Sequence, residues 1–367
     1  MKQIAKRMRE LHDGVDLEEE ELAGGPKVFY NWDKWVDRCE RVIGWLDKEI
    51  QSPQNESKAA SEPWRRRGYV CGVPWPRFRK AVEDYRKWLV VSSGGVEEIK
   101  HQLVFGHNDT QYGNLLRMEP SQQSPLLLPE NEHKQLVVID FEYASANPPG
   151  LEFANHFVSS ATRISRVNTD YPKTEWCYNY HDTERPWACN ARVYPTPEQQ
   201  HQFITAYLTH RPGLGGRASP SITPLMRPLS TSTSTMTPLD LNASPDMAPQ
   251  RQTDIERAHQ DSLEAEAQFL MRQTRLWRVL NSAQWVAWGI VQAKVPEVED
   301  DDEAKTPTAA TPPVDGNVDE ADEFDYLAYA QDRAMFFWAD LVSLGFVKKD
   351  QLPPLLAEHV EARVIDY

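Results

Sequence analysis

A polar segment lies between two short apolar runs near the middle of the chain, in the sequence FGHNDTQYGNLLR at residues 105–117. The runs at 103–105 and 115–118, and a third at 136–141, have the length and composition of strands. Residues 119–134 are polar and contain proline, which is typical of an enlarged hairpin loop. We therefore expect a small sheet that carries a polar loop, and this combination restricts the folds that the chain can adopt.

Apolar residues recur at helical spacing on both sides of the predicted strands. Helices are predicted at 1–11, 32–50 and 78–91 before the strands, and at 255–280, 284–294, 324–344 and 352–364 after them, with a further helix following Pro197. Many helices around a few short strands predict an α+β fold.

Two segments have a composition that does not favour a packed core. Residues 212–253 are rich in serine, threonine and proline, and residues 296–323 are acidic and rich in threonine and proline. Burial of their few apolar side chains cannot offset the lost chain entropy, so we expect both segments to be disordered inserts.

Composition also argues against several classes of function. The formal net charge of −15 repels nucleic acid, so no nucleic-acid partner is expected. The four cysteines show no C-x-x-C spacing, which favours buried thiols over a zinc site. No apolar run has the length of a membrane span, so we expect a soluble, cytoplasmic protein.

The polar loop has the residue spacing of a phosphoryl-transfer site. HNDTQYGN fits the pattern H-x-D-x-x-x-x-N, and an aspartate, Asp140, ends a later strand. In this layout Asp109 would accept the proton of a substrate hydroxyl, while Asn114 and Asp140 would offer hard oxygen ligands to Mg²⁺. Taken alone, the tripeptide HND also fits a simple turn between two strands.

Further segments extend this pattern into a family resemblance. HNDTQYGN and VVIDFEYASANPPGLEFANHF, together with QWVAWGIVQAK and EFDYLAYAQDR, resemble the choline/ethanolamine kinase family. The resemblance implies a fold similar to those of protein kinases and aminoglycoside phosphotransferases, with choline or ethanolamine as substrate, ATP as co-substrate and Mg²⁺ as cofactor. Gln111 would join Asp109 and Asn114 in the catalytic loop. The residues implied to surround the ammonium group of the substrate are Tyr143, Glu175, Tyr180, Trp285, Trp288, Phe324 and Tyr329.

The chemistry of the substrate supports an aromatic pocket. A trimethylammonium group has no N–H to donate, so it is recognised by aromatic faces and carboxylates. The aromatic residues therefore favour choline over ethanolamine, which remains the alternative. The spacing of Trp285 and Trp288 alone also fits a buried helix face.

The sequence departs from the family pattern at three places. No glycine-rich loop follows a strand before Asp109, and IAKRMRELH resembles the start of the family's carboxy-terminal lobe. We therefore interpret residues 1–367 as mainly that lobe and expect weak or no ATP binding and impaired activity. Residues 158–173 are interpreted as an insert, either a retained intron or a surface loop. Glu152 replaces the aspartate usual in the family.

Two other interpretations remain open from the sequence. The chain could be a non-catalytic pseudokinase that binds a quaternary amine or a partner, although it retains Asp109, Asn114 and Asp140. A homodimer is also left open.

Overall fold

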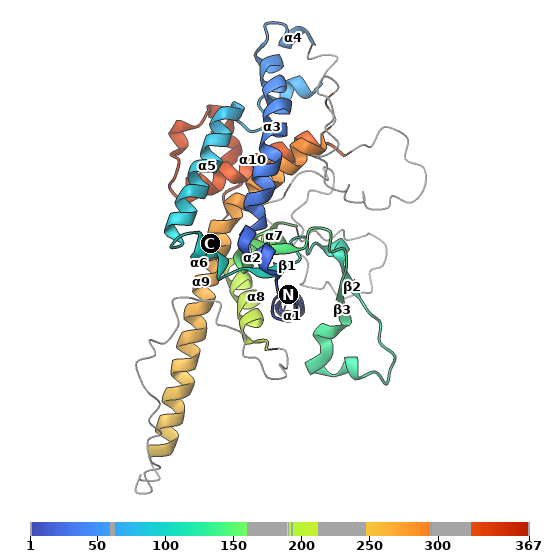
Figure 1. Cartoon of the computed structure of the whole chain (residues 1–367), viewed down its shortest axis with the longest axis vertical. Coiled ribbons are helices and arrows are strands. Elements are labelled where there is room, and N and C mark those ends of the chain that lie inside the picture. Colours follow the sequence, from blue (N-terminus) through green and yellow to red (C-terminus); the bar gives the residue numbers. More distant parts are fainter. Residues whose placement is uncertain are drawn as a thin grey trace.

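Helices dominate a computed structural model of the chain, which describes residues 2–58, 63–159, 189, 191, 194–211, 247–293, 295 and 324–365. The long helix α9 (Met247–Gln292) runs through the molecule and contacts α3, α7, α8 and α10 (Figure 1). Its residues from Ala267 onward are largely buried, whereas most of those between 256 and 265 are exposed. The carboxy-terminal part of α9 is thus the element around which the other helices pack.

The remaining elements follow in chain order. Before the strands lie α1 (Lys2–Gly14), α2 (Glu19–Gly24), α3 (Lys27–Gln51), α4 (Asn55–Lys58), η1 (Pro63–Arg67), α5 (Trp75–Ser92) and α6 (Val96–Lys100). The strands are β1 (Val104–Gly106), β2 (Leu115–Arg117), β3 (Leu136–Val138) and β4 (Ser145–Asn147), with η2 (Tyr112–Asn114), η3 (Pro125–Leu127) and η4 (Pro129–Gln135) between them. After them come α7 (Pro149–Ser159), α8 (Pro197–Thr209), α10 (Tyr326–Ser343), η9 (Lys349–Gln351) and α11 (Pro354–Glu361).

The helix α3 shows how local sequence sets an element and its buried face. Pro26 lies immediately before the helix, where the missing N–H of proline removes no helical hydrogen bond. Trp32, Trp35, Cys39 and Leu46 recur three, four and seven residues apart and are all buried. The helix therefore presents one apolar stripe to the core.

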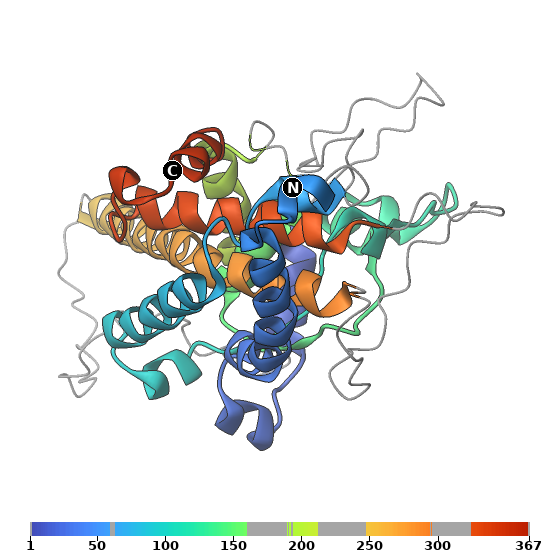
Figure 2. The ribbon, with the colours of Figure 1, turned by 90° about the horizontal axis from the view of Figure 1, so that it is seen from above.

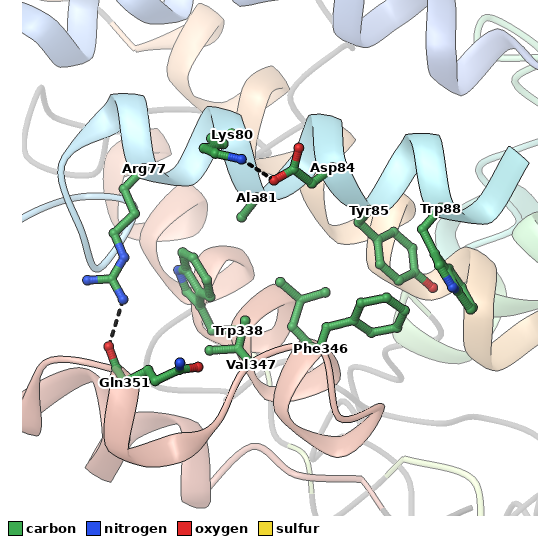
Figure 3. Close-up of a pocket in the computed structure, with 11 residues that line it drawn as sticks. Arg77, Lys80, Ala81, Asp84, Tyr85, Trp88, Trp338, Phe346, Val347 and Gln351 are labelled. Carbon is green, nitrogen blue, oxygen red and sulfur yellow. Dashed lines mark hydrogen bonds and ion pairs between the residues drawn. The ribbon is translucent and has the colours of Figure 1, made fainter. Parts of the chain in front are cut away.

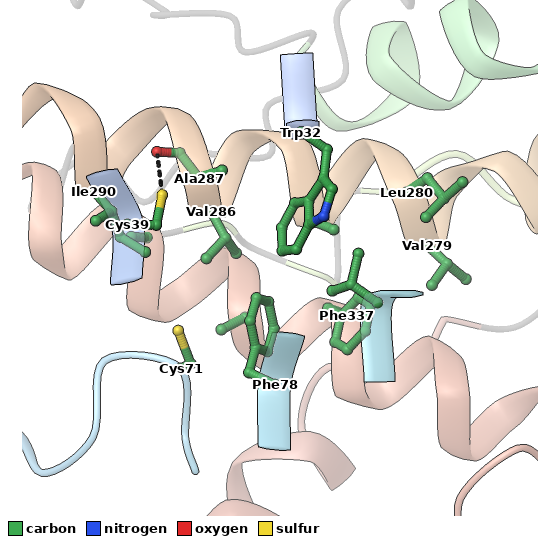
Figure 4. Close-up of a cluster of buried hydrophobic side chains, with 14 of the residues drawn as sticks. Trp32, Cys39, Cys71, Phe78, Val279, Leu280, Val286, Ala287, Ile290 and Phe337 are labelled. Atoms are coloured by element: carbon green, nitrogen blue, oxygen red, sulfur yellow. Dashed lines mark hydrogen bonds between the residues drawn. The ribbon is translucent and has the colours of Figure 1, made fainter. Parts of the chain in front are cut away.

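The larger of two apolar clusters joins α3, α5, α9, α10 and α11. Figure 4 shows Trp32, Phe78 and Phe337 pointing into the same interior as Val286 and side chains around it on α9. Burial of a large apolar side chain contributes roughly 1.5–3 kcal/mol, so this cluster is the main source of stability. Figure 2 shows α10 lying beside α9, which agrees with the contacts between them.

A second apolar cluster lies mainly between α1, α7 and α8. It contains Met8, Phe153, Phe157, Phe203 and Tyr207, all of which are buried. Phe153 and Phe203 meet edge to face with ring centroids 5.7 Å apart. This cluster supports the strand that precedes the polar loop.

The α+β class is confirmed, but the prediction of one small sheet was wrong. The described strands form two antiparallel pairs, β1 with β4 and β2 with β3. Phe105 lies opposite Ala146 in the first pair, and Leu116 lies opposite Val137 in the second. The polar loop separates β1 from β2, so β1 finds its partner in β4, whose sequence Ser-Ala-Asn has no strand pattern. The second pair is the predicted hairpin with an enlarged loop.

Two predicted helices, at 255–280 and 284–294, are one continuous helix, α9. No proline or glycine separates Leu280 from Gln284, and the polar residues Asn281 and Ser282 are buried in the interior. The helix begins at Met247, inside the segment 212–253 that was predicted to be disordered. Most of that segment, the insert 296–323 and residues 160–173 lie outside the described residues, while Val158 and Ser159 end α7.

The cysteines follow the prediction where they can be assessed. Cys39 and Cys71 are buried free thiols and Cys189 is a half-buried one, whereas Cys177 lies outside the described residues. None of the described helices combines the length and apolar character needed to cross a membrane.

Candidate active site

The loop between β1 and β2 brings the three predicted polar residues together. Asn114 Nδ2 donates hydrogen bonds to the backbone oxygen and to Oδ2 of Asp109, both at 2.9 Å. Gln111 Nε2 donates to the same Oδ2 at 3.3 Å. The Asp109 carboxylate is therefore oriented by two side-chain amides from its own loop.

Asn108, for which the sequence pattern predicted no role, holds the start of this loop. Its φ of 60° lies in the left-handed region that asparagine tolerates better than most residues. Its Nδ2 lies 3.0 Å from the backbone oxygens of Gly106 and Tyr143, and its Oδ1 accepts a hydrogen bond from Asn147 at 3.0 Å. An asparagine flanked by histidine and aspartate was the signal that could have identified this position.

Glu152 supports the loop from α7 and connects it to α1. Its Oε1 accepts a hydrogen bond from the backbone N–H of His107 at 3.1 Å, and its Oε2 lies 2.6 Å from His12 Nε2. Burial alone would raise the pKa of Glu152, but the neighbouring His12 and the His107 N–H lower it overall. The glutamate side chain thus reaches two elements at once.

Asp140 follows β3 and lies near Asp109. The preceding residue, Ile139, donates its N–H to the Asn114 backbone oxygen at 3.0 Å, and His107 Nε2 lies 2.9 Å from the Ile139 oxygen. Asp140 is exposed and has a φ of 67°. The end of β3 is therefore tied directly to the polar loop.

The carboxylates of this region influence each other's protonation. Burial raises the pKa of Asp109 to about 6, and the charge of Asp140 contributes, while His107, Gln111 and Asn114 oppose the shift. Burial also raises the pKa of Glu142, with further contributions from Asp140 and Asp109. The pKa values of Asp109 and Glu142 are thus raised by neighbouring negative charge as well as by burial, and a bound cation would relieve that repulsion.

The described residues of the predicted ammonium pocket form one row of touching rings. The ring centroids of Tyr143 and Trp285 are 5.8 Å apart, those of Trp285 and Trp288 are 5.5 Å apart, and those of Trp288 and Tyr329 are 5.6 Å apart. Phe324 continues the row at 5.9 Å from Tyr329. Glu175 and Tyr180 lie outside the described residues.

One member of this row, Tyr326, was not predicted from the sequence. Tyr326 contacts Trp288 and Phe324, with centroids 5.6 and 5.0 Å apart. It lies three residues before Tyr329 in the aromatic segment EFDYLAYAQDR, so helical spacing could have identified it. The row therefore combines residues from the end of α9 and the start of α10 with Tyr143.

A short chain of hydrogen bonds joins the aromatic row to the polar loop. Trp285 Nε1 donates to Asn155 Oδ1 at 2.8 Å, and Asn155 Nδ2 donates to the backbone oxygen of Asn108 at 2.6 Å. All three residues are buried. The position of the indole and the position of the loop that carries Asp109 are consequently coupled.

Comparison with known proteins decides the family. A sequence model described as choline/ethanolamine kinase matches residues 1–338. This chain belongs to the choline/ethanolamine kinase family. Membership confirms the resemblance predicted from the sequence and, with it, the kinase-like α+β fold.

The family relatives are longer than this chain. Choline kinase of Saccharomyces cerevisiae is 26% identical, over 95% of this chain and 56% of that protein. Ethanolamine kinase of the same yeast is 21% identical, over 95% of this chain and 55% of that protein. The solved structure of choline kinase from Cryptosporidium parvum aligns over 95% of this chain and 67% of that chain, with 16% identity and a TM-score of 0.42. The chain thus spans about half the length of the yeast relatives.

A separate groove of about 580 Å³ lies away from the choline/ethanolamine kinase motifs. Figure 3 shows it between α5 and the segment that follows α10, with Tyr85, Trp88 and Phe346 on one side. Trp88 and Phe346 are both partly exposed and meet edge to face. None of the predicted site residues lines this groove, so it offers positions for control substitutions.

Proposed function

We propose that this chain carries the acceptor site of an ATP-dependent choline kinase. In the reaction, the choline hydroxyl oxygen attacks the γ-phosphorus of ATP, the bond to the bridging oxygen breaks, and phosphocholine and ADP form. The observation that carries the proposal is the connection between Asp109 and the aromatic row through Asn108, Asn155 and Trp285. A base and a cation site held side by side suit a substrate whose hydroxyl and ammonium groups are two carbons apart.

Asp109 would orient and deprotonate the hydroxyl. Its Oδ2 accepts hydrogen bonds from Asn114 and Gln111, so its orientation is set before substrate binds. A positioned base of this kind contributes roughly 10²–10⁴-fold to the rate.

The residues present fit Mg²⁺. Both hydrogen bonds of the Asn114 side chain use its amide nitrogen, which leaves the amide oxygen as a hard ligand. Asp140 adds an exposed carboxylate to the same region. When bound, the cation would neutralise charge that develops on the transferred phosphoryl group.

The aromatic row would hold the ammonium group through cation–π attraction. A quaternary ammonium gains most from such faces, whereas the primary ammonium of ethanolamine also needs hydrogen-bond acceptors. The higher identity to a relative named choline kinase than to one named ethanolamine kinase supports choline as the first candidate. A comparison of kcat/KM for the two amines tests this choice.

Two finer predictions and one open question accompany the proposal. Phosphocholine would enter phosphatidylcholine synthesis, the protein would act in the cytoplasm, and assembly as a homodimer stays open. Calorimetry with Mg-ATP tests the expectation of weak nucleotide binding by this chain.

The base is tested by Asp109→Ala, with Asp84→Ala as the matched control. Asp84 pairs with Lys80 on the exposed face of α5 and lines the separate groove. In a form of the protein that phosphorylates choline, we expect Asp109→Ala to abolish that activity while leaving choline affinity, measured by calorimetry, within about twofold of wild type. Asp84→Ala should change neither. Turnover retained by Asp109→Ala would remove this residue from the role of base.

The cation site is tested by Trp288→Leu, with Trp88→Leu as the control. A cation–π contact contributes about 0.5–2 kcal/mol, so choline affinity should fall roughly 2- to 30-fold in the first variant only. Equal losses in both variants would argue against the aromatic row.

If the wild-type chain binds choline but transfers no phosphate, a non-catalytic amine-binding protein becomes the better description.

A further inference from the structure

Three side chains with metal-binding groups converge at a place that the phosphoryl-transfer chemistry does not use. Glu10 comes from α1, His133 from η4 in the hairpin loop, and His210 follows the last residue of α8. Glu10 Oε1 lies 2.8 Å from His133 Nε2 and 3.2 Å from His210 Nε2. The ligand atoms all lie within 4.8 Å of one another.

The two imidazoles are held by packing as well as by the carboxylate. Their ring centroids are 4.7 Å apart with an interplanar angle of 69°. The side chain of His133 is only 4% exposed and that of His210 is 14% exposed. Burial and ring packing therefore restrict the orientation of each imidazole, and in both rings Nε2 points towards Glu10 Oε1.

The spacing of Glu10 Oε1 from each imidazole nitrogen is close to what a tetrahedral metal requires. Zinc binds imidazole nitrogen at about 2.0–2.1 Å and carboxylate oxygen at about 2.0–2.2 Å, so neighbouring ligand atoms lie roughly 3.3–3.4 Å apart. The two distances from Glu10 Oε1 fall a few tenths of an ångström short of that separation, and small side-chain rotations would supply the difference.

The surroundings orient the carboxylate. Arg7 forms an ion pair with Oε2 of Glu10, which leaves Oε1 directed towards the two imidazoles. The cationic side chains of Arg7 and Lys6 weaken cation binding here, because both lie close enough to affect Glu10 or His133. The site must therefore rely on direct nitrogen and oxygen coordination rather than on a surplus of negative charge.

We propose that Glu10, His133 and His210 bind one divalent transition metal ion, with Zn²⁺ as the best match, and that water completes the coordination. Two imidazoles and one carboxylate suit zinc better than magnesium, which prefers oxygen ligands only. The site is thus chemically distinct from the one predicted at Asn114 and Asp140. It does not depend on the proposed kinase activity.

Binding would tie three segments that are far apart in the sequence. α1 would be joined to the hairpin loop and to the end of α8, and α1 also carries His12, which contacts Glu152 beneath the polar loop. We therefore expect the metal to stabilise the chain around its second apolar cluster rather than to take part in phosphoryl transfer.

The test is a calorimetric titration of the metal-stripped chain with Zn²⁺ alone, using His210→Gln and the matched control His201→Gln. His201 lies on the same helix, α8, and also contacts a glutamate, Glu264, at 2.8 Å, but has no third ligand beside it among the described residues. We expect one Zn²⁺ per wild-type chain and a rise in Tm on binding. His210→Gln removes one of three ligands and should weaken Zn²⁺ affinity by at least about 100-fold. Residues that only hydrogen-bond to a metal ligand already contribute 10- to 100-fold to affinity. His201→Gln should match wild type.

His210 is chosen because it lies at a helix end and is partly exposed, so its substitution should not disturb folding, which circular dichroism checks. A Co²⁺ titration of the wild-type chain identifies the ligand type without a variant. Cobalt bound by cysteine shows a thiolate charge-transfer absorption band, whereas cobalt bound by nitrogen and oxygen ligands shows none. Absence of stoichiometric Zn²⁺ binding, equal affinity of the two variants, or a thiolate band that places the metal on cysteine would each overturn the proposal.

Discussion

Replacement of Asn155 by leucine should destabilise the chain by disconnecting the aromatic row from the polar loop. Leucine has a similar shape but can neither accept the Trp285 N–H nor donate to the Asn108 oxygen. Two buried groups would then lack partners. Each such group costs about 1–3 kcal/mol, so the free energy of unfolding should fall by roughly 2–6 kcal/mol.

A double-mutant cycle isolates the contribution of the Asn155–Trp285 hydrogen bond. Trp285→Phe removes the indole N–H and leaves Asn155 Oδ1 without that donor. Each single variant breaks this bond and leaves one of its two groups behind, whereas the double variant removes both groups. The double variant should therefore lose about 2 kcal/mol less than the sum of the single losses, within the range observed for residues in contact.

Urea unfolding followed by far-UV circular dichroism gives all four free energies, and the measurement requires neither substrate nor activity. Additive losses would refute the reasoning, because they would mean that the bond contributes nothing beyond the separate side chains. A loss below about 1 kcal/mol for Asn155→Leu would show that water satisfies the abandoned groups.

Two further predictions concern stability. Burial raises the pKa of Asp47 to about 6, so the folded state holds a proton that the unfolded state releases, and stability falls as pH rises from about 4 to 6. Asp47→Asn should remove up to about 3 kcal/mol of this loss and should be more stable than wild type at pH 7. Urea unfolding of both proteins across this pH range measures the difference. Parallel plots of unfolding free energy against pH would contradict the assignment. A Cβ on Gly150 would lie 2.9 Å from the backbone of Gln273 in α9, so Gly150→Ala should cost about 1–3 kcal/mol. Gly44→Ala, where a Cβ meets nothing within 4 Å, should stabilise by up to about 1 kcal/mol, and thermal unfolding compares the two.

Local sequence patterns were enough to predict most helices and the polar loop. The stripe on α3 and the aromatic face of α5 depend on residues three or four positions apart, so each can be recognised without knowing what packs against it. Asp109, Gln111 and Asn114 lie within one short loop, and their hydrogen bonds form inside it. For the same reason, their proximity could be predicted without tertiary information.

The spacing of Trp285 and Trp288 fitted both a buried helix face and a ligand pocket. In the structure Trp285 is buried and bonded to Asn155, while Trp288 touches two tyrosines at the start of α10. The two descriptions are compatible, because a partly buried aromatic row can contribute to the core and present an edge to a ligand.

The sequence by itself determined the local elements and the polar residues that meet in one loop, because those depend on neighbours along the chain. Only the tertiary structure decided that β1 pairs with β4 and that Glu10 meets His133 and His210. These contacts join segments separated by tens to hundreds of residues. Their formation depends on how helices pack around α9, and no local pattern carries that information.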